Sequence, residues 1–381
     1  VDRVEAIREA IKMADKKDLK KRKEEREEKK EIRKEKKKKQ EAVLRELAHF
    51  MEDVNKTVEK DEEEIDEIEE FAGFVQEEST AAGRMMSELM YRFTNDLEIG
   101  KKIKMGELRK NYDKLELEWR PPEEYNMTTF HLENFSMKLL SKKENPNFEK
   151  VILQLHGGGY IGAIYNTYYN VAVLYSEAAK GICVLSPDYR VAPEHPYPAA
   201  LEDAVASYQW LLDHGWRGDQ IILAGDSAGG GLSMALTMYL RDHDMPLPCG
   251  IVAMSPWTDL TASGESYTLN YELDPLFGNT RESMIFINDY PGDHDKKDPY
   301  ISPIYGNFRE FPPMLIQVGS TEMLLSDSIT VAGMADIVGV DVRLSIYDDM
   351  FHVFQLSGKI LPEAQKAWDE IEQFLTLLLN E

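Results

Sequence analysis

One segment constrains the fold of this chain more than any other: a short apolar run that leads directly into a Gly-x-Ser-x-Gly turn. Residues 221–224 predict a buried strand, and residues 232–236 continue as a helix. A serine on such a turn is held in a strained backbone conformation that presents its hydroxyl, and glycines at 225 and 229 let neighbouring backbone approach. We therefore predict that Ser227 is a nucleophile; the alternative is a chance glycine-rich turn.

Short apolar runs alternate with amphipathic stretches from residue 123 to the end of the chain. This alternation predicts an α/β fold, in which a mostly parallel sheet carries helices on both faces. We expect strands at residues 130–140, 151–155, 182–186, 220–224, 251–254, 314–318 and 342–346, and helices at residues 198–212, 227–240, 327–337 and 362–379. Residues 258–299 interrupt the rhythm with turn formers, which predicts a lid insertion near the mouth of the site.

The first part of the chain has a different composition. Residues 1–50 carry 19 basic and 13 acidic side chains, whereas residues 51–80 carry 2 and 13. Lys, Arg and Glu favour helix, but residues 15–40 hold too few apolar side chains to bury a face. We predict a charged helical extension over 1–75, a helical cap over 76–122 and the main domain over 123–381. The extension is also a candidate contact for a homo-oligomer.

The charge balance limits the partners of the chain. A net charge of -24 repels nucleic acid over most of the surface. No run of about 18 apolar residues indicates a membrane span, and no charged-then-apolar leader opens the sequence. Each of the two cysteines lies in an apolar run, where a cysteine usually behaves as a small buried hydrophobic residue. We expect a cytoplasmic protein without a membrane span.

A second glycine-rich turn follows the expected strand at 151–155, in the sequence His156-Gly157-Gly158-Gly159. Successive glycines allow backbone N–H groups to point inward, as a developing oxyanion requires. We predict Gly157 and Gly158 as two donors and Ala228, directly after the serine, as the third. A phosphate loop is the alternative, but no Lys-Ser or Lys-Thr follows the glycines.

A serine nucleophile needs a base and an acid that orients the base. Of the eight histidines, His352 follows the last expected strand, where the base falls in the chain order serine, acid, histidine. For the acid, Glu322 lies at the end of the preceding strand, and Asp327 follows five residues later at a helix start. We prefer Glu322 and keep Asp327 as the alternative.

No cofactor or metal is expected. Two Asp-His-Asp triplets, at residues 242–244 and 293–295, invite a metal interpretation. Neither has the helical histidine spacing or the cysteine partners of a zinc site. Solvated loops are the simpler interpretation.

Several motifs in order resemble the hormone-sensitive-lipase-like family of α/β-hydrolases. They are the His-Gly-Gly-Gly turn, Asp188-Tyr189-Arg190 with Glu194, the Gly-Asp-Ser-Ala-Gly elbow, the Ser255-Pro256-Trp257 segment, and the segments around Glu322 and His352. The resemblance covers residues 120–380 and is closest to a microbial carboxylesterase subgroup. It implies an eight-stranded sheet, a cap built partly from N-terminal helices and hydrolysis of short- to medium-chain acyl esters. Glu322 stands where an aspartate is more usual in the family.

The functional expectation is a serine carboxylesterase with a Ser-His-Glu triad. A small-molecule receptor on the same scaffold would keep the pocket without the complete triad. A lyase would usually alter an oxyanion glycine. Both alternatives are weaker, because serine, acid, histidine and the glycines are all present.

Overall fold

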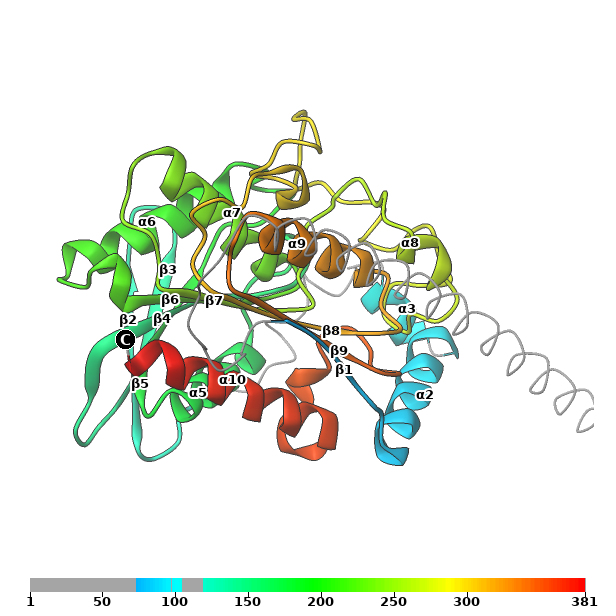
Figure 1. The fold of residues 1–381 in the computed structure, drawn as a ribbon, viewed down its shortest axis with the longest axis horizontal. Helices are drawn as coiled ribbons and strands as arrows, with labels where there is room; N and C mark the ends of the chain where they lie inside the picture. Colours follow the sequence, from blue (N-terminus) through cyan, green and yellow to red (C-terminus); the bar gives the residue numbers. More distant parts are fainter. Residues whose placement is uncertain (1–72, 97, 105–118, 381) are drawn as a thin grey trace, which may run out of the picture. The chain divides into compact units, whose positions relative to one another are not determined.

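The computed structural model of this protein describes residues 73–96, 98–104 and 119–380. Within these residues the core is one nine-stranded sheet with helices on both faces (Figure 1), in the order β1-β9-β8-β7-β6-β4-β5-β3-β2. The strands are β1 Gly73–Glu77, β2 Tyr125–His131, β3 Ser136–Lys142, β4 Asn147–Leu155, β5 Ile182–Asp188, β6 Ile221–Asp226, β7 Gly250–Met254, β8 Met314–Gly319 and β9 Val342–Tyr347. This architecture confirms the predicted α/β class.

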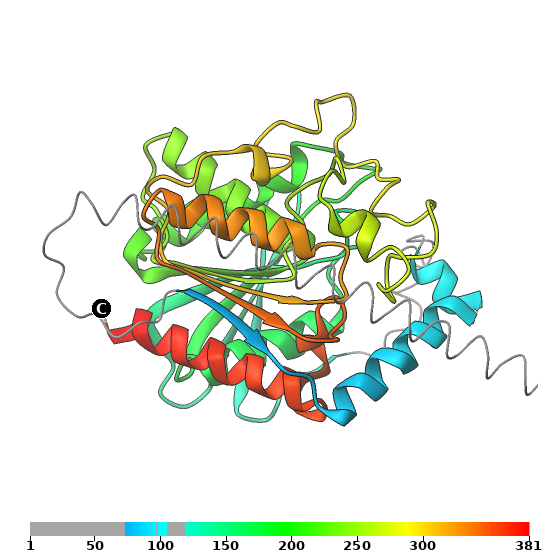
Figure 2. The ribbon, with the colours of Figure 1, turned by 45° about the vertical axis from the view of Figure 1, so that its right-hand side comes forward.

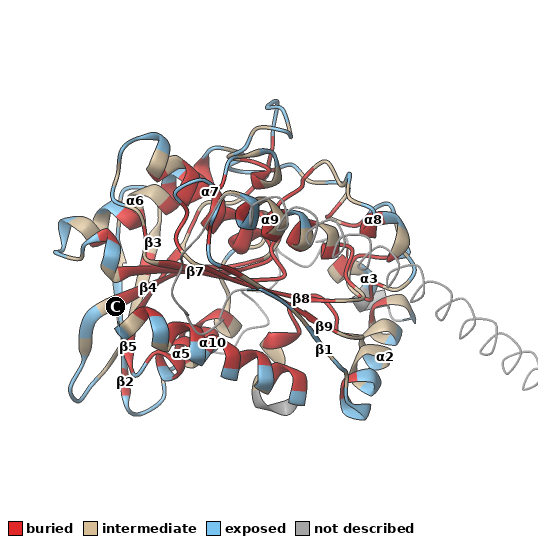
Figure 3. Ribbon diagram, viewed as in Figure 1, coloured by how far each residue is buried: buried red, intermediate tan, exposed pale blue. Residues whose placement is uncertain are grey.

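All neighbouring strands run parallel except at one end, where β3 pairs antiparallel with both β2 and β5. The central strands β6, β7 and β8 are buried along their whole length (Figure 3), as strands covered by helices on both faces must be. Their carboxyl ends therefore meet at one edge of the sheet, where ligands commonly bind in open α/β sheets.

Helices cover the two faces of the sheet unequally. One face is covered by α5 Asn166–Ala178 and α10 Pro362–Asn380, whose apolar side chains join those of the strands in a single cluster. The other face carries α6 Ala199–Asp213, α7 Ala228–Asp242 and α9 Leu325–Ile337 (Figure 1). The four helices expected in this part of the sequence are all present. Short 3₁₀ turns span Gly218–Gln220, Pro303–Tyr305 and Phe354–Ile360.

The sheet has one strand more than the eight that the family resemblance implies. β1 forms one edge of the sheet and pairs in parallel with β9, from Gly73 opposite Arg343 to Glu77 opposite Tyr347 (Figure 2). The helical extension predicted over 1–75 is therefore wrong for residues 73–75, and the helical cap predicted over 76–122 is wrong for residues 76–77, because pairing with a strand about 270 residues away decides their conformation. The rest of that extension, including its predicted oligomer contact, lies outside the described residues.

The single strand expected at residues 130–140 is also wrong, because the structure has a hairpin there. β2 and β3 are joined by a turn in which the Leu132 amide donates to the Phe135 carbonyl at 2.9 Å. Glu133 and Asn134 at the tip are polar turn residues. The two strands then pair over seven residues.

Before the main domain, α2 Ala81–Asp96 and α3 Glu98–Lys104 pack near the insertion that follows β7. That insertion is mostly turns, with one short helix, α8 Ser266–Leu269. Among the described helices, none combines the length and the apolar character that crossing a bilayer requires.

Candidate active site

The predicted nucleophile, Ser227, lies between β6 and α7 in an unusual backbone conformation, with φ 51° and ψ −123°. Positive φ is costly for a residue with a side chain, so the surroundings must impose it. Here the Ser227 amide donates to Met254 at 2.9 Å, and the Ser227 carbonyl accepts from Trp257 at 2.8 Å. The elbow is thus fixed from the neighbouring strand β7 and the loop that follows it.

The glycines of the elbow are required by close backbone contacts. A methyl group on Gly229 would lie 2.0 Å from the carbonyl oxygen of Leu155 in β4. A methyl group on Gly225 would lie 2.4 Å from the carbonyl oxygen of Gly229. No larger residue fits either position, which is the physical basis of the sequence pattern.

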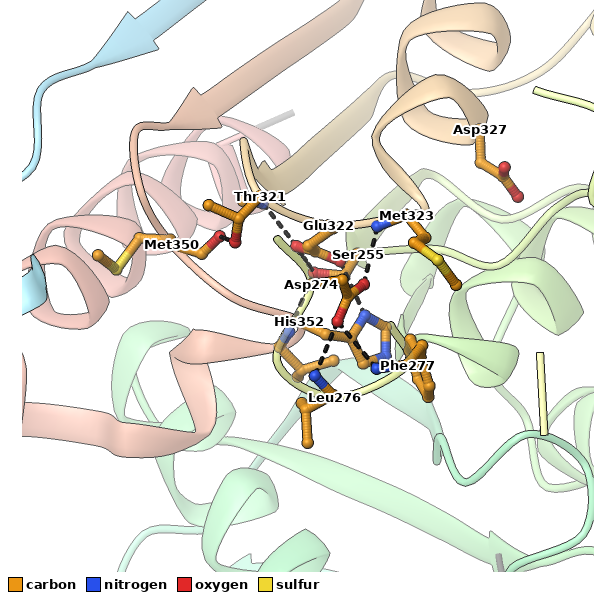
Figure 4. Close-up of polar contacts among 12 residues, drawn as sticks. Ser255, Asp274, Leu276, Phe277, Thr321, Glu322, Met323, Asp327, Met350 and His352 are labelled. Carbon is orange, nitrogen blue, oxygen red and sulfur yellow. Dashed lines mark hydrogen bonds and ion pairs between the residues drawn. The ribbon is translucent and has the colours of Figure 1, made fainter. Parts of the chain in front are cut away.

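The predicted acid and base are in contact. Glu322 follows β8, His352 follows β9, and the His352 Nδ1 atom lies 2.8 Å from Glu322 Oε2 (Figure 4). Because a carboxylate can only accept, Nδ1–H donates and Nε2 remains free to accept a proton. The other oxygen, Glu322 Oε1, accepts from Ser255 Oγ at 2.7 Å and from the Gly319 amide at 2.5 Å. Three donors thus compensate a carboxylate that is completely buried.

Ser255 is a site residue to which sequence reasoning gave no role. Its hydroxyl donates to Glu322 and accepts from the Val353 amide at 3.1 Å, so it connects the acid loop to the loop of His352. Its φ of 47° is also in the left-handed region. The sequence feature that could have identified Ser255 is its position as a polar residue directly after the apolar strand β7.

The alternative acid, Asp327, lies apart from His352 on the first turn of α9 (Figure 4). Its Oδ2 atom accepts from the amides of Thr258 and Asp259, each at 2.8 Å. Burial, together with the nearby Asp259, raises the pKa of Asp327 to about 8. Asp327 therefore anchors the start of the insertion.

The predicted nucleophile and base are connected less closely than the predicted acid and base. Both side chains are described, and no hydrogen bond joins the Ser227 hydroxyl to the His352 ring in this structure. Catalytic hydrogen bonds are often long before substrate binds. The charge of His352 nevertheless opposes the rise in the pKa of Asp226, the residue before Ser227, which indicates that the ring lies near the elbow.

The glycine turn requires a correction. The Gly157 amide donates to Asp226 Oδ1 at 3.0 Å and is therefore not free to bind an oxyanion, contrary to our prediction. The cause is a long-range contact that the sequence did not reveal, because Asp226 lies 69 residues away. The next amides, of Gly158 and Gly159, donate to no atom of the described residues. Both glycines have positive φ, at 108° and 63°.

Two buried ionisable groups, Asp226 and His156, contact this turn. Asp226 also accepts from the Tyr168 hydroxyl at 3.1 Å, and burial raises the pKa of Asp226 to about 6. The buried His156 ring stacks on Tyr189 at 4.0 Å, and its Nδ1 lies 2.7 Å from the Gly157 carbonyl oxygen. Burial lowers the pKa of His156 to about 4, so the ring is neutral near pH 7. These groups hold the turn in place.

The signature residue Arg190 holds the chain after β5. Its guanidinium binds Asp203, at distances down to 2.8 Å, and Glu202 at 3.0 Å. Both partners lie in α6, so the contact ties that helix to the chain after β5. These contacts give Arg190 a structural role.

The insertion contacts both His352 and the glycine turn. Phe277 packs its ring against His352, with centroids 4.7 Å apart and an interplanar angle of 61°. Asn288 donates from Nδ2 to the Gly159 carbonyl at 2.7 Å. The described residues contain no cluster of three His, Cys, Asp or Glu side chains that could hold a metal.

Comparison with known proteins gives consistent relatives. Residues 152–356 match a family described as alpha/beta hydrolase fold. An acetyl-hydrolase of Streptomyces hygroscopicus is 37% identical over 232 residues, which cover 61% of this chain and 77% of the relative. An esterase of Acinetobacter venetianus is 33% identical over 236 residues, 62% of this chain and 78% of the relative.

Solved structures agree with these relatives. An esterase from the bacterial hormone-sensitive lipase family superposes with a TM-score of 0.69 at 34% identity, covering 78% of this chain and 98% of that one. The esterase EstE5, soaked with p-nitrophenyl butyrate, gives a TM-score of 0.70 at 32% identity, covering 80% of this chain and 100% of that one.

Proposed function

Since the chain belongs to the hormone-sensitive-lipase-like family of α/β-hydrolases and is a carboxylic ester hydrolase, we propose that Ser227, His352 and Glu322 form its catalytic triad. The observation that carries this assignment is the 2.8 Å contact between Glu322 and His352, at the sheet edge that also bears the strained Ser227 elbow. Asp327 has no such contact, since its acceptor oxygen holds two backbone amides of the insertion.

In the proposed reaction, the Ser227 hydroxyl attacks the ester carbonyl carbon while His352 Nε2 takes the hydroxyl proton. Glu322 holds the ring in the tautomer with hydrogen on Nδ1 and stabilises the imidazolium that forms. The imidazolium then protonates the departing alcohol, which leaves an acyl group on Ser227. Water, deprotonated by the same histidine, releases the carboxylic acid and restores the serine.

We assign the oxyanion donors to the amides of Gly158, Gly159 and Ala228. The first two donate to no acceptor among the described residues and belong to a turn whose positive φ values suit glycine. Ala228 is the first residue of α7, so its amide has no acceptor within the helix. Removing one donor of this kind typically lowers the rate about 10²–10³-fold.

We propose short- to medium-chain acyl esters of neutral alcohols as the substrate class. The names of the relatives, an acetyl-hydrolase and esterases, favour small acyl groups. Phe277 from the insertion places an apolar ring beside His352. The net charge of -24 disfavours anionic esters.

A panel of p-nitrophenyl esters, from acetate through butyrate and octanoate to palmitate, tests the proposal with wild type and Ser227→Ala. We expect wild type to hydrolyse the shorter esters and Ser227→Ala to lose at least about a thousandfold in kcat. Equal rates for the two proteins would contradict the role of Ser227. A wild type inactive on every ester would favour the receptor or lyase alternative.

A further inference from the structure

The insertion carries a second buried carboxylate beside the proposed acid and base. Asp274 is completely buried and belongs to the turn that ends at Phe277. Figure 4 shows its side chain next to the His352 ring, between Glu322 and Leu276. Neither the proposed triad nor the oxyanion donors use this group.

Backbone amides from two different segments bind the Asp274 carboxylate. Its Oδ1 accepts from the amides of Leu276 at 2.8 Å and Phe277 at 2.9 Å, which shapes the turn of the insertion. Its Oδ2 accepts from the Met323 amide at 2.8 Å, directly after Glu322. One side chain thus joins the turn that carries Phe277 to the loop that carries the proposed acid.

A neighbouring residue strengthens the same connection. Asn270 donates from Nδ2 to the carbonyl of Glu322 at 2.6 Å and to that of Ser320 at 3.1 Å. The Glu322 loop is therefore held from the insertion by several side chains, including Ser266, whose hydroxyl donates to the Met323 carbonyl, and Phe277 lies against the His352 ring at 4.7 Å.

The three donors to Asp274 are amides, so the negative charge of its ionised form remains to act on nearby groups. Among the described residues, the charged groups that face Asp274 include His352, Glu322 and, from α3, Lys104. His352 in turn is faced by Glu322, Asp226 and Asp274. Burial raises the pKa of Asp274, whereas the amide hydrogen bonds and the charge of His352 oppose that rise.

We propose that Asp274 is a positioning residue, which holds the Glu322 loop and Phe277 against His352 and presents a second negative charge to the imidazolium. This inference rests on the proposed triad, because Asp274 acts only through His352. A nearby carboxylate stabilises the protonated ring, which forms as Ser227 loses its proton.

The test is the pH dependence of kcat/KM for p-nitrophenyl butyrate with the full chain, comparing wild type with Asp274→Asn. The neutral ring is the active base, so removing the negative charge lowers the pH at which His352 becomes neutral. We expect the acid limb of the profile to move down by about half a unit to one unit. The plateau rate falls about three- to tenfold, since the imidazolium of the transition state loses the same attraction.

Matched variants separate charge from packing. Asp274→Glu keeps the charge, so its acid limb stays close to that of wild type. Asp274→Ser is a second neutral variant whose hydroxyl can still accept from the turn amides, for use where Asp274→Asn does not fold. Asp327→Asn changes another buried side chain that accepts backbone amides. Since its carboxyl group is largely protonated below pH 8, we expect this substitution to leave the acid limb in place.

An acid limb that does not move in either neutral variant would overturn the inference and leave the triad assignment intact, provided that Ser227→Ala is inactive. A limb that moves equally in Asp327→Asn would also overturn it. If Ser227→Ala hydrolyses the ester at the wild-type rate, the proposed triad fails and the role of Asp274 fails with it.

Discussion

Replacing Glu322 by Gln is the substitution that most directly examines the proposed acid. In wild type, Oε1 accepts from Ser255 Oγ and the Gly319 amide, whereas Oε2 accepts from His352 Nδ1–H and from no other described residue. The amide oxygen of Gln therefore takes the Oε1 position, which keeps two hydrogen bonds and loses one. The amide nitrogen then faces Nδ1, where two donors cannot bind each other.

The His352 ring responds by moving its proton. With hydrogen on Nε2 and an accepting Nδ1, the ring binds the Gln nitrogen but can no longer take the proton of Ser227. A tautomer error of this type lowers kcat about 10³–10⁴-fold in a serine hydrolase triad. That factor corresponds to about 4–5.5 kcal/mol of activation free energy. Because Glu322 is completely buried, KM should change little.

The assay is steady-state hydrolysis of p-nitrophenyl butyrate by wild type, Glu322→Gln and Asp327→Asn, with thermal melting to verify the fold. We expect only Glu322→Gln to lose activity on this scale. A Glu322→Gln variant within tenfold of wild type would refute the tautomer argument. A thousandfold loss in Asp327→Asn with an active Glu322→Gln would reverse the assignment of the acid.

Three other predictions concern the elbow, the oxyanion turn and pH. Gly229→Ala should lower the free energy of unfolding by about 1–3 kcal/mol or more, because its methyl group meets the Leu155 carbonyl at 2.0 Å. By contrast, the methyl group of Gly333→Ala in α9 meets nothing within 4 Å. This substitution should raise the free energy of unfolding, measured by denaturant titration, by about 0.5–1 kcal/mol. Gly158→Ala should lower kcat about a hundredfold at similar KM, because a residue with a side chain is strained at φ 108° and would turn its amide away from the oxyanion. An unaltered kcat would argue against the Gly158 amide as a donor. Asp327 has a pKa of about 8 in the folded protein against an ordinary 3.8, so the folded state binds its proton more tightly and stability is lost as pH rises from about 4 to 8. The melting temperature of Asp327→Asn minus that of wild type should therefore increase across this range, and a constant difference would contradict the shift.

Part of the architecture could be predicted because its signals are local. The run from β6 through Ser227 into α7 combines an apolar strand, small residues at Gly225 and Gly229 and a helix, all within about twenty residues. The same holds for α10, which begins with Pro362 and Glu363, residues typical of a helix start. The order of serine, acid and histidine along the chain then predicted Glu322 and His352, which the structure brings into contact.

Other features could not be predicted, because contacts between distant residues decide them. β1 is a strand only through its pairing with β9, although a charged segment precedes it. The hairpin of β2 and β3 depends on β5 as a pairing partner. From the sequence alone, Asp274 can be interpreted only as a turn former in an irregular insertion.

The sequence by itself determined the fold class and the elbow, and it predicted the side chains that we propose as reactive, because backbone geometry and hydrophobic periodicity are encoded over short spans. Tertiary structure alone decided which groups are free to react. Gly157 lies in the predicted turn, yet its amide is bound by Asp226, 69 residues away. Whether a polar group is occupied or open depends on what the fold brings within about 3 Å of it, and that distance is set by packing rather than by the sequence around the group.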